Sequence, residues 1–120
     1  MGASTALALS DRGHEVTVYD PNLLSDGRGS SHGRSRIVRR AYPDPFYTEI
    51  MQEGYPMWHS LQKRSGEAIL FECGLLYFGP GSSPTLTDVA TSLDANDVPH
   101  EVLDAADSNR RFPSLKIEGD

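Results

Sequence analysis

One pattern near the start of the chain constrains its fold most: a helix-forming stretch, a glycine, and an alternating stretch that ends in an acid. Residues 3–12 are rich in Ala and Leu, and Gly13 follows as a helix stop. Residues 15–20 (Glu-Val-Thr-Val-Tyr-Asp) alternate polar and apolar side chains, which predicts a β-strand. The strand ends in Asp20, eighteen residues after Gly2. This order is typical of the second half of a βαβ unit.

Some βαβ units bind dinucleotides through a glycine-rich turn that opens the helix and an acid that ends the second strand. The glycines let the backbone approach a pyrophosphate, and the helix N-terminus favours the anion. Gly2 stands where the third glycine would lie, and Asp20 stands where the ribose-binding acid would lie. The first strand and the first two glycines are not in the sequence. An ordinary amphipathic helix, with Asp20 capping a turn, is therefore an alternative.

The remainder of the chain alternates between predicted helices and strands. Asp44 as N-cap and Pro45 at the first helical position predict a helix over residues 46–64, with Gly54 and Pro56 interrupting it. Further helices are expected at residues 85–96 and 104–111, and strands at 68–72, 75–79 and 100–103, with a hairpin around Cys73 and Gly74. Residues 37–42 fit a short helix or an extended piece. The order indicates an α/β or α+β class.

Length and composition exclude several classes of protein. A chain of 120 residues is one domain at most, and its net charge of −6 argues against a general nucleic-acid binder. The single cysteine, Cys73, allows neither an internal disulfide nor a cysteine-based zinc cluster, and the histidines show no metal-ligand spacing. No apolar run approaches the roughly 20 residues that cross a bilayer. We expect a soluble protein with no metal, nucleic-acid or membrane partner.

The positive charge is concentrated in one short segment. Five of the eleven basic residues lie within thirteen residues that contain no acid: Arg28, Arg34, Arg36, Arg39 and Arg40. Arg36 and Arg39 would share one face if a helical turn formed there. A guanidinium offers a planar fork to carboxylate or phosphate, so the cluster predicts a local anion site. The alternative is that these arginines pair with surface acids.

The segment Gly-Ser-Ser-His-Gly-Arg-Ser-Arg-Ile-Val-Arg-Arg-Ala-Tyr, residues 29–42, resembles a motif of the sarcosine oxidase type of FAD-dependent amine oxidases. These enzymes belong to the D-amino-acid-oxidase-like flavoprotein superfamily, and N-methyltryptophan oxidase is a relative. The likeness extends over nearly the whole chain, including Gly2, Asp20 and Trp58. It departs from close relatives at Ser31 and Arg34, where a histidine and an acid are common. The resemblance implies a partial Rossmann-like FAD-binding domain with the start of a mixed α+β substrate region.

The resemblance also implies residue roles. Gly2 would contact the FAD pyrophosphate region and Asp20 the adenosine ribose. Arg36 would place a positive charge beside the isoalloxazine ring, where it favours the reduced flavin. Arg39 would hold the substrate carboxylate, and these two arginines form the predicted catalytic pair. The other implied residues are Ser30, Ser31 and His32 beside the flavin and Tyr42 beside the substrate.

On this interpretation the chain is an N-terminal fragment of an enzyme. Residues 1–42 would be a truncated FAD-binding segment, and residues 43–120 the start of the substrate region. The enzyme would oxidise the C–N bond of a secondary (N-methyl) amino acid with O2, giving H2O2. We expect it in the cytoplasm, with the peroxisome as the alternative, and we expect the isolated chain to bind FAD weakly and to be inactive. The alternatives are a non-catalytic phosphate-binding or other anion-binding module and an inactive truncated gene product.

Overall fold

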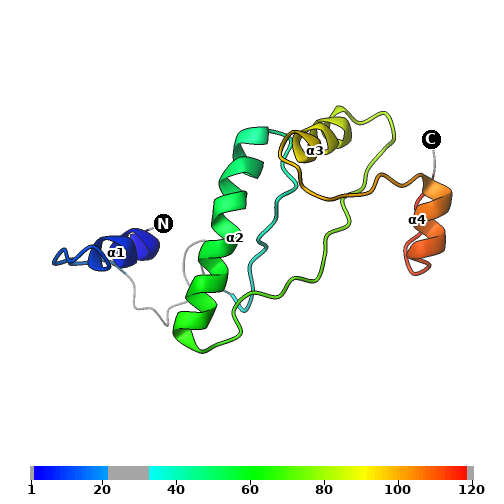
Figure 1. Ribbon diagram of the computed structural model, residues 1–120. Helices are drawn as coiled ribbons and strands as arrows, with labels where there is room; N and C mark the ends of the chain where they lie inside the picture. The colour runs from blue at the N-terminus through cyan, green and yellow to red at the C-terminus, as the bar shows by residue number, and fades with distance from the viewer. Residues whose placement is uncertain (1, 22–32, 119–120) are drawn as a thin grey trace. The chain divides into compact units, whose positions relative to one another are not determined.

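The computed structural model describes residues 2–21 and 33–118. The chain divides into two compact units, Met1–Ile37 and Val38–Asp120. The regular elements of the described residues are four helices (Figure 1). None of these helices combines the length and the apolar character that a membrane span needs.

The first unit contains helix α1, Gly2–Ser10. The predicted helix over residues 3–12 is thereby confirmed, with its last residues forming a turn rather than helix. Gly13 has φ +82°, a left-handed conformation that ends the helix, as the sequence predicts. No residue of α1 is buried. The helix therefore depends on its own backbone hydrogen bonds more than on a core.

The predicted strands are wrong as regular elements of the described structure. Residues 15–20, 68–72, 75–79 and 100–103 have irregular backbone without a ladder to a neighbouring segment. A strand needs a partner for its backbone groups, and in residues 68–72 a side chain takes that place. Gln62 Oε1 accepts hydrogen bonds from the N–H groups of Ile69 and Leu70, both at 2.9 Å. The alternation of polar and apolar residues predicted strands in these segments, but it does not indicate which segment would pair with which.

Helix α2, Pro45–Ser65, opens the second unit as the sequence predicts. The Asp44 side chain caps it by accepting a hydrogen bond from the Phe46 N–H at 3.0 Å, with Pro45 in the first turn. The helix is continuous through Gly54 and Pro56, so an unravelled turn there, one form of the predicted interruption, is wrong. Proline removes only one intrahelical donor. The neighbouring Tyr55 fastens this turn by donating its hydroxyl to the Val38 carbonyl at 3.2 Å.

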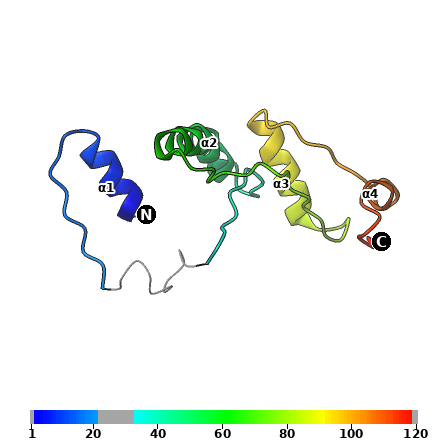
Figure 2. The ribbon, with the colours of Figure 1, turned by 90° about the horizontal axis from the view of Figure 1, so that it is seen from below.

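Helix α3, Pro84–Ala95, packs against α2 (Figure 2). The contact has a polar centre, since the fully buried side chains are Thr48 of α2 and Ser92 of α3, with hydroxyl oxygens 2.8 Å apart. The buried apolar residues beside it are Ala41, Val89 and Leu93. The predicted helix over residues 85–96 is confirmed, with Ser83 as its N-cap residue.

Helix α4, Ala105–Arg111, confirms the last predicted helix. Asp104 caps it by accepting a hydrogen bond from the Asp107 N–H at 2.8 Å. Asn109 then binds the backbone of Ile117 twice, donating to its carbonyl at 2.6 Å and accepting from its N–H at 2.8 Å. These paired hydrogen bonds hold the segment after α4 against the helix.

Candidate functional site

The arginine-bearing segment belongs to both units. Ser30, Ser31 and His32 lie outside the described residues, so their predicted roles stay predictions. Residues 34–42 form no helical turn, so the extended alternative holds for residues 37–42, and Arg36 and Arg39 do not share a helix face. Arg36 belongs to the first unit and Arg39 to the second. The arginines 36, 39 and 40 have three different surroundings.

Arg36 folds back on its own backbone. Its Nη1 donates to the Ser35 carbonyl at 2.6 Å. A Cβ at Gly33 would lie 3.0 Å from the same Nη1, and Gly33 has φ +101°. The positive φ favours glycine at position 33, and a side chain there would also displace the end of the Arg36 side chain. In this structure, the space beside Gly33 is therefore occupied by the guanidinium of Arg36.

Arg39 lies against two tyrosine rings. Its Cζ atom is 4.8 Å from the ring centroid of Tyr42 and 5.9 Å from that of Tyr77, both within cation–π range. The Tyr42 ring is in turn placed by Tyr47 of α2, with ring centroids 5.8 Å apart. The structure thus brings together Arg39 and Tyr42, the two residues predicted for the substrate side.

Arg40 anchors the same segment to α2. Its guanidinium lies over the Tyr55 ring with Cζ 3.8 Å from the centroid, and its Nε is buried without a hydrogen-bond partner among the described residues. Its carbonyl oxygen accepts from the Thr48 hydroxyl at 2.9 Å and from the Tyr42 N–H at 3.0 Å. The second bond closes a tight turn, so the backbone from Arg39 to Tyr42 is fixed from both sides.

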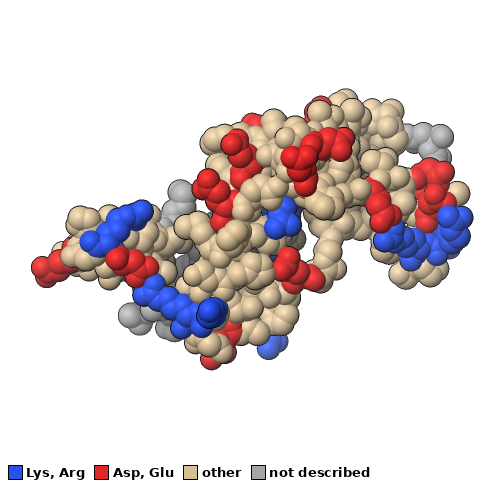
Figure 3. Space-filling model, viewed as in Figure 1, with Lys and Arg blue, Asp and Glu red and all other residues tan. Residues whose placement is uncertain are grey.

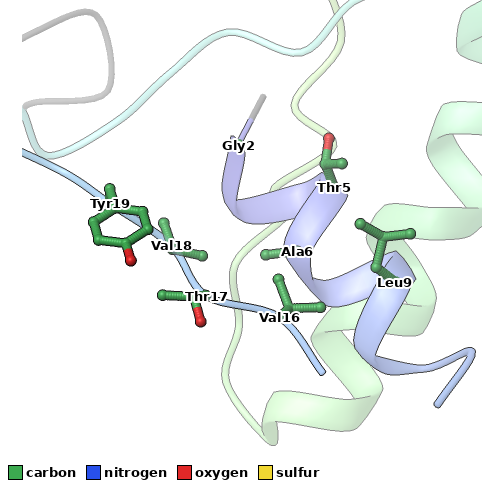
Figure 4. Close-up of a pocket in the computed structure, with 8 residues that line it drawn as sticks. All are labelled: Gly2, Thr5, Ala6, Leu9, Val16, Thr17, Val18 and Tyr19. Carbon is green, nitrogen blue, oxygen red and sulfur yellow. The ribbon is translucent and has the colours of Figure 1, made fainter. Parts of the chain in front are cut away.

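In the first unit, a pocket of about 360 Å³ lies between α1 and the segment that follows it (Figure 4). The segment returns along the helix, so that Tyr19 lies at the same end of the helix as Gly2. Asp20, which is exposed, follows Tyr19 directly. No described atom lies within 4 Å of the place where a Cβ at Gly2 would be. Of the two residues predicted to contact pyrophosphate and ribose, Gly2 therefore lines this pocket, and Asp20 directly follows Tyr19 of its lining. The pocket lining is Gly2, Thr5, Ala6, Leu9, Val16, Thr17, Val18 and Tyr19.

The arginines near the C-terminus have a different role. Arg110 pairs with Asp107, and Arg111 pairs with Glu101. Figure 3 shows the blue and red side chains together at α4. These two cations are matched by acids. Arg39 has neither an ion pair nor a hydrogen bond to any residue that the structure describes.

Three contributors to this site were missed by sequence reasoning: Tyr77, Thr48 and Ser92. Tyr77 lies in a segment that alternation assigns to a strand, and nothing local links it to Arg39. Thr48 and Ser92 are polar residues on helices, which usually face solvent. One available signal was that Met51, Gln52 and Tyr55 lie three, four and seven residues after Thr48, a spacing that places them on the same side of α2 as Thr48.

No metal site is found among the described residues, where no group of three or more metal-ligating side chains occurs. Cys73 is exposed and has a free thiol. Its thiol donates a hydrogen bond to the carbonyl of the next residue, Gly74, with Sγ 3.6 Å from the oxygen. Neither observation adds a second site.

Comparison with known proteins gives consistent relatives. The chain is 36% identical to mouse peroxisomal sarcosine oxidase over 116 residues, 97% of this chain and 30% of that protein. It is 35% identical to monomeric sarcosine oxidase of Streptomyces avermitilis over 121 residues, 100% of this chain and 32% of that protein. It is 28% identical to N-methyl-L-tryptophan oxidase of Yersinia pestis over 118 residues, 98% of this chain and 32% of that protein.

The chain thus spans about a third of the length of the curated relatives it matches. No solved structure matches it significantly. The profile of the FAD dependent oxidoreductase family, DAO, matches residues 1–120, the whole of the sequence. The chain therefore belongs to the FAD dependent oxidoreductase family.

Proposed function

We propose that this chain supplies the nucleotide contacts and the substrate-carboxylate contact of an oxidase that acts on the C–N bond of a secondary (N-methyl) amino acid. Family membership supports the use of FAD, for which the family is named. The names of the relatives, sarcosine oxidase and N-methyl-L-tryptophan oxidase, support an N-methyl amino acid as substrate. The observation that carries the proposal is Arg39, held by tyrosine rings and paired with no described acid.

The residues of the first unit fit part of an FAD molecule. Gly2 is the first residue of α1 and has open space beside it. Asp20 directly follows Tyr19, which lines the pocket at the same end of the helix as Gly2. A helix N-terminus with free N–H groups suits a pyrophosphate, and a carboxylate suits ribose hydroxyls. Ser30, Ser31, His32 and Arg36 complete the proposed contacts to the cofactor. FAD held there would supply the redox chemistry: it would accept a hydride equivalent from the C–N carbon, leaving an imine for hydrolysis, and O2 would reoxidise the flavin with release of H2O2.

The chain's own residues orient the substrate. Arg39 binds the carboxylate as a two-pronged donor, and Tyr42 forms one wall beside it. This contact holds the amino acid so that its C–N carbon faces the flavin, which is a proximity contribution to the rate. Arg36 adds a fixed positive charge beside the flavin ring. Residues 1–42 thus serve the cofactor and the substrate carboxylate, and residues 43–120 begin the substrate region and hold Arg39 in place.

The names of the relatives also support a proposal for the location of the protein in the cell. The mouse and human relatives are named peroxisomal sarcosine oxidases, whereas the Streptomyces relative is named monomeric sarcosine oxidase. We propose a cytoplasmic or peroxisomal location, and fluorescence microscopy of the tagged natural protein tests it.

The test uses the natural protein that contains this chain, purified with its flavin absorption recorded. We expect H2O2 production with N-methyl amino acids. Arg39→Met should lower kcat/KM for these substrates on the order of 100-fold, because two charge-assisted hydrogen bonds are lost. The matched control is Arg34→Met, a nearby exposed arginine, which should leave kcat/KM within about twofold.

Two results would contradict the proposal. One is an Arg39→Met protein that retains flavin and oxidises N-methyl amino acids as efficiently as the unchanged protein. The other is a protein that binds no flavin under any condition. An equal loss for amines with and without a carboxylate would show that Arg39 acts on something other than the carboxylate.

A further inference from the structure

The surroundings of Arg39 differ from those of Arg40, Arg110 and Arg111 in the second unit. Arg110 and Arg111 are held by acids, and Arg40 has its carbonyl and its guanidinium fastened to α2. Arg39 is held by aromatic faces on two segments far apart in the sequence, one at Tyr42 and one at Tyr77. No described acid competes for its N–H groups.

An aromatic face and an acid hold a guanidinium in different ways. An acid occupies the N–H edge, so the fork is no longer open to a second carboxylate. A ring attracts the cation through its face and leaves the N–H edge open. Two rings restrict the tilt of the guanidinium plane more than one ring does. The arrangement around Arg39 therefore orients a fork whose hydrogen-bonding capacity is still available.

The first ring is fixed independently of Arg39. Tyr42 packs on Tyr47, and its N–H donates to the Arg40 carbonyl, which also accepts from the fully buried Thr48. The second ring comes from the segment after the glycine turn at Gly74, where φ is +77°. Tyr77 is 36% exposed, whereas its neighbour Phe78 is 62% exposed. Tyr77 is thus the aromatic residue of this pair that turns toward Arg39.

We propose that Tyr77 is a positioning residue, which together with Tyr42 clamps the Arg39 guanidinium so that its N–H fork is presented to the carboxylate of the substrate. This inference rests on the proposed function of Arg39, but it adds a residue that neither the motif nor the fold prediction assigns. The ring is the active part of Tyr77, since no hydrogen bond of its hydroxyl to a described residue is found.

The experiment follows the Arg39 side-chain Nε–Hε signal by NMR in the 120-residue chain labelled with ¹⁵N-arginine. Ring currents from Tyr42 and Tyr77 should displace this signal from the position of an exposed arginine. Tyr77→Leu should remove part of that displacement, whereas Tyr77→Phe, which keeps the ring, should preserve it. Phe78→Leu is the matched control, which removes the neighbouring aromatic ring and should leave the Arg39 signal in place.

Titration with propionate then tests the link to carboxylate binding, with propionamide as the neutral control probe. The apparent Kd for propionate is taken from the shift of the Arg39 signal during the titration. Tyr77→Leu should raise this Kd about two- to fivefold, because one cation–π contact is lost. Tyr77→Phe should bind propionate like the unchanged chain. Trp58 fluorescence during urea unfolding verifies that each variant is folded.

The outcomes separate the two proposals. If Tyr77→Leu leaves the Arg39 signal unchanged in a folded chain, the clamp is wrong, whatever propionate does. If Tyr77→Leu moves the signal but propionate has no effect on the unchanged chain, the clamp stands and the carboxylate role of Arg39 fails. Should Tyr77→Leu unfold the chain, Tyr77→Phe and Tyr42→Leu still decide the matter, because loss of the Tyr42 ring alone must leave the displacement due to Tyr77.

Discussion

The two units of the chain differ in how their side chains are held. In Met1–Ile37, helix α1 has no buried residue, and Leu9 is 38% exposed. In Val38–Asp120, Thr48 and Ser92 are fully buried, and Leu93 is 8% exposed. The proposed substrate side, around Arg39, is therefore preformed by packing. On the proposed nucleotide side, none of the described residues of the first unit is buried.

The difference has a physical cause. A helix of nine residues is marginal by itself, because nucleation is costly and stability in proteins comes mostly from packing. Helix α2 has 21 residues, caps at both ends and a partner helix. The following predictions test this contrast, from the largest expected effect to the smallest.

A matched pair of leucine substitutions should separate the units most clearly. Leu93→Ala should lower the free energy of unfolding of the second unit by about 2–5 kcal/mol, because it leaves a cavity in a small core. Leu9→Ala should change it by less than about 0.5 kcal/mol. Urea unfolding followed by Trp58, the single tryptophan, measures both. A large effect of Leu9→Ala would break the contrast.

Removing the buried hydroxyl of Thr48 should have the second-largest effect on the free energy of unfolding. Thr48→Val keeps the shape but removes the donor to the Arg40 carbonyl and leaves the Ser92 hydroxyl buried without Thr48. We expect a loss of about 1–3 kcal/mol in the free energy of unfolding. Thr48→Ser, which retains the hydroxyl, should lose less. A Thr48→Val, Ser92→Ala double variant should lose less than the sum of the single variants, and strict additivity would contradict the pairing.

The helix cap of α2 should have a smaller effect. Asp44→Ala removes the acceptor for the Phe46 N–H and should cost about 1 kcal/mol in the free energy of unfolding. Asp44→Asn keeps an acceptor oxygen and serves as the control, with most of the stability retained. The same urea titration reports both, and equal midpoints for Asp44→Ala and the unchanged chain would show that the cap is not needed.

Addition of FAD should have the smallest effect of all. We expect the 120-residue chain to bind FAD weakly, so FAD should not shift the urea midpoint reported by Trp58. Ligand stabilisation grows with the ratio of free ligand to Kd, so a ratio below one adds less than about 0.5 kcal/mol. Flavin that co-purifies with the chain through gel filtration would contradict this prediction.

Local features of the fold could be predicted from particular residues. Asp44 and Pro45 mark the start of α2, Gly13 ends the first helical stretch, and Asp104 starts α4. Each is a capping or stop signal that acts within a few residues. The break predicted at Pro56 did not occur, since Tyr55 binds the Val38 carbonyl and carries the Arg40 guanidinium. A local rule was overruled there by tertiary contacts.

By itself the sequence determined the positions of the helices, the family, and the concentration of arginines in a segment without acids. These properties depend on near neighbours in the chain or on residue identity. Only the tertiary structure decided that Arg39 lies against Tyr77 and that Thr48 meets Ser92 in a buried contact. It also decided that the alternating segments form no ladder among the described residues. Pairing between distant segments depends on how the chain folds back, which short-range patterns do not encode.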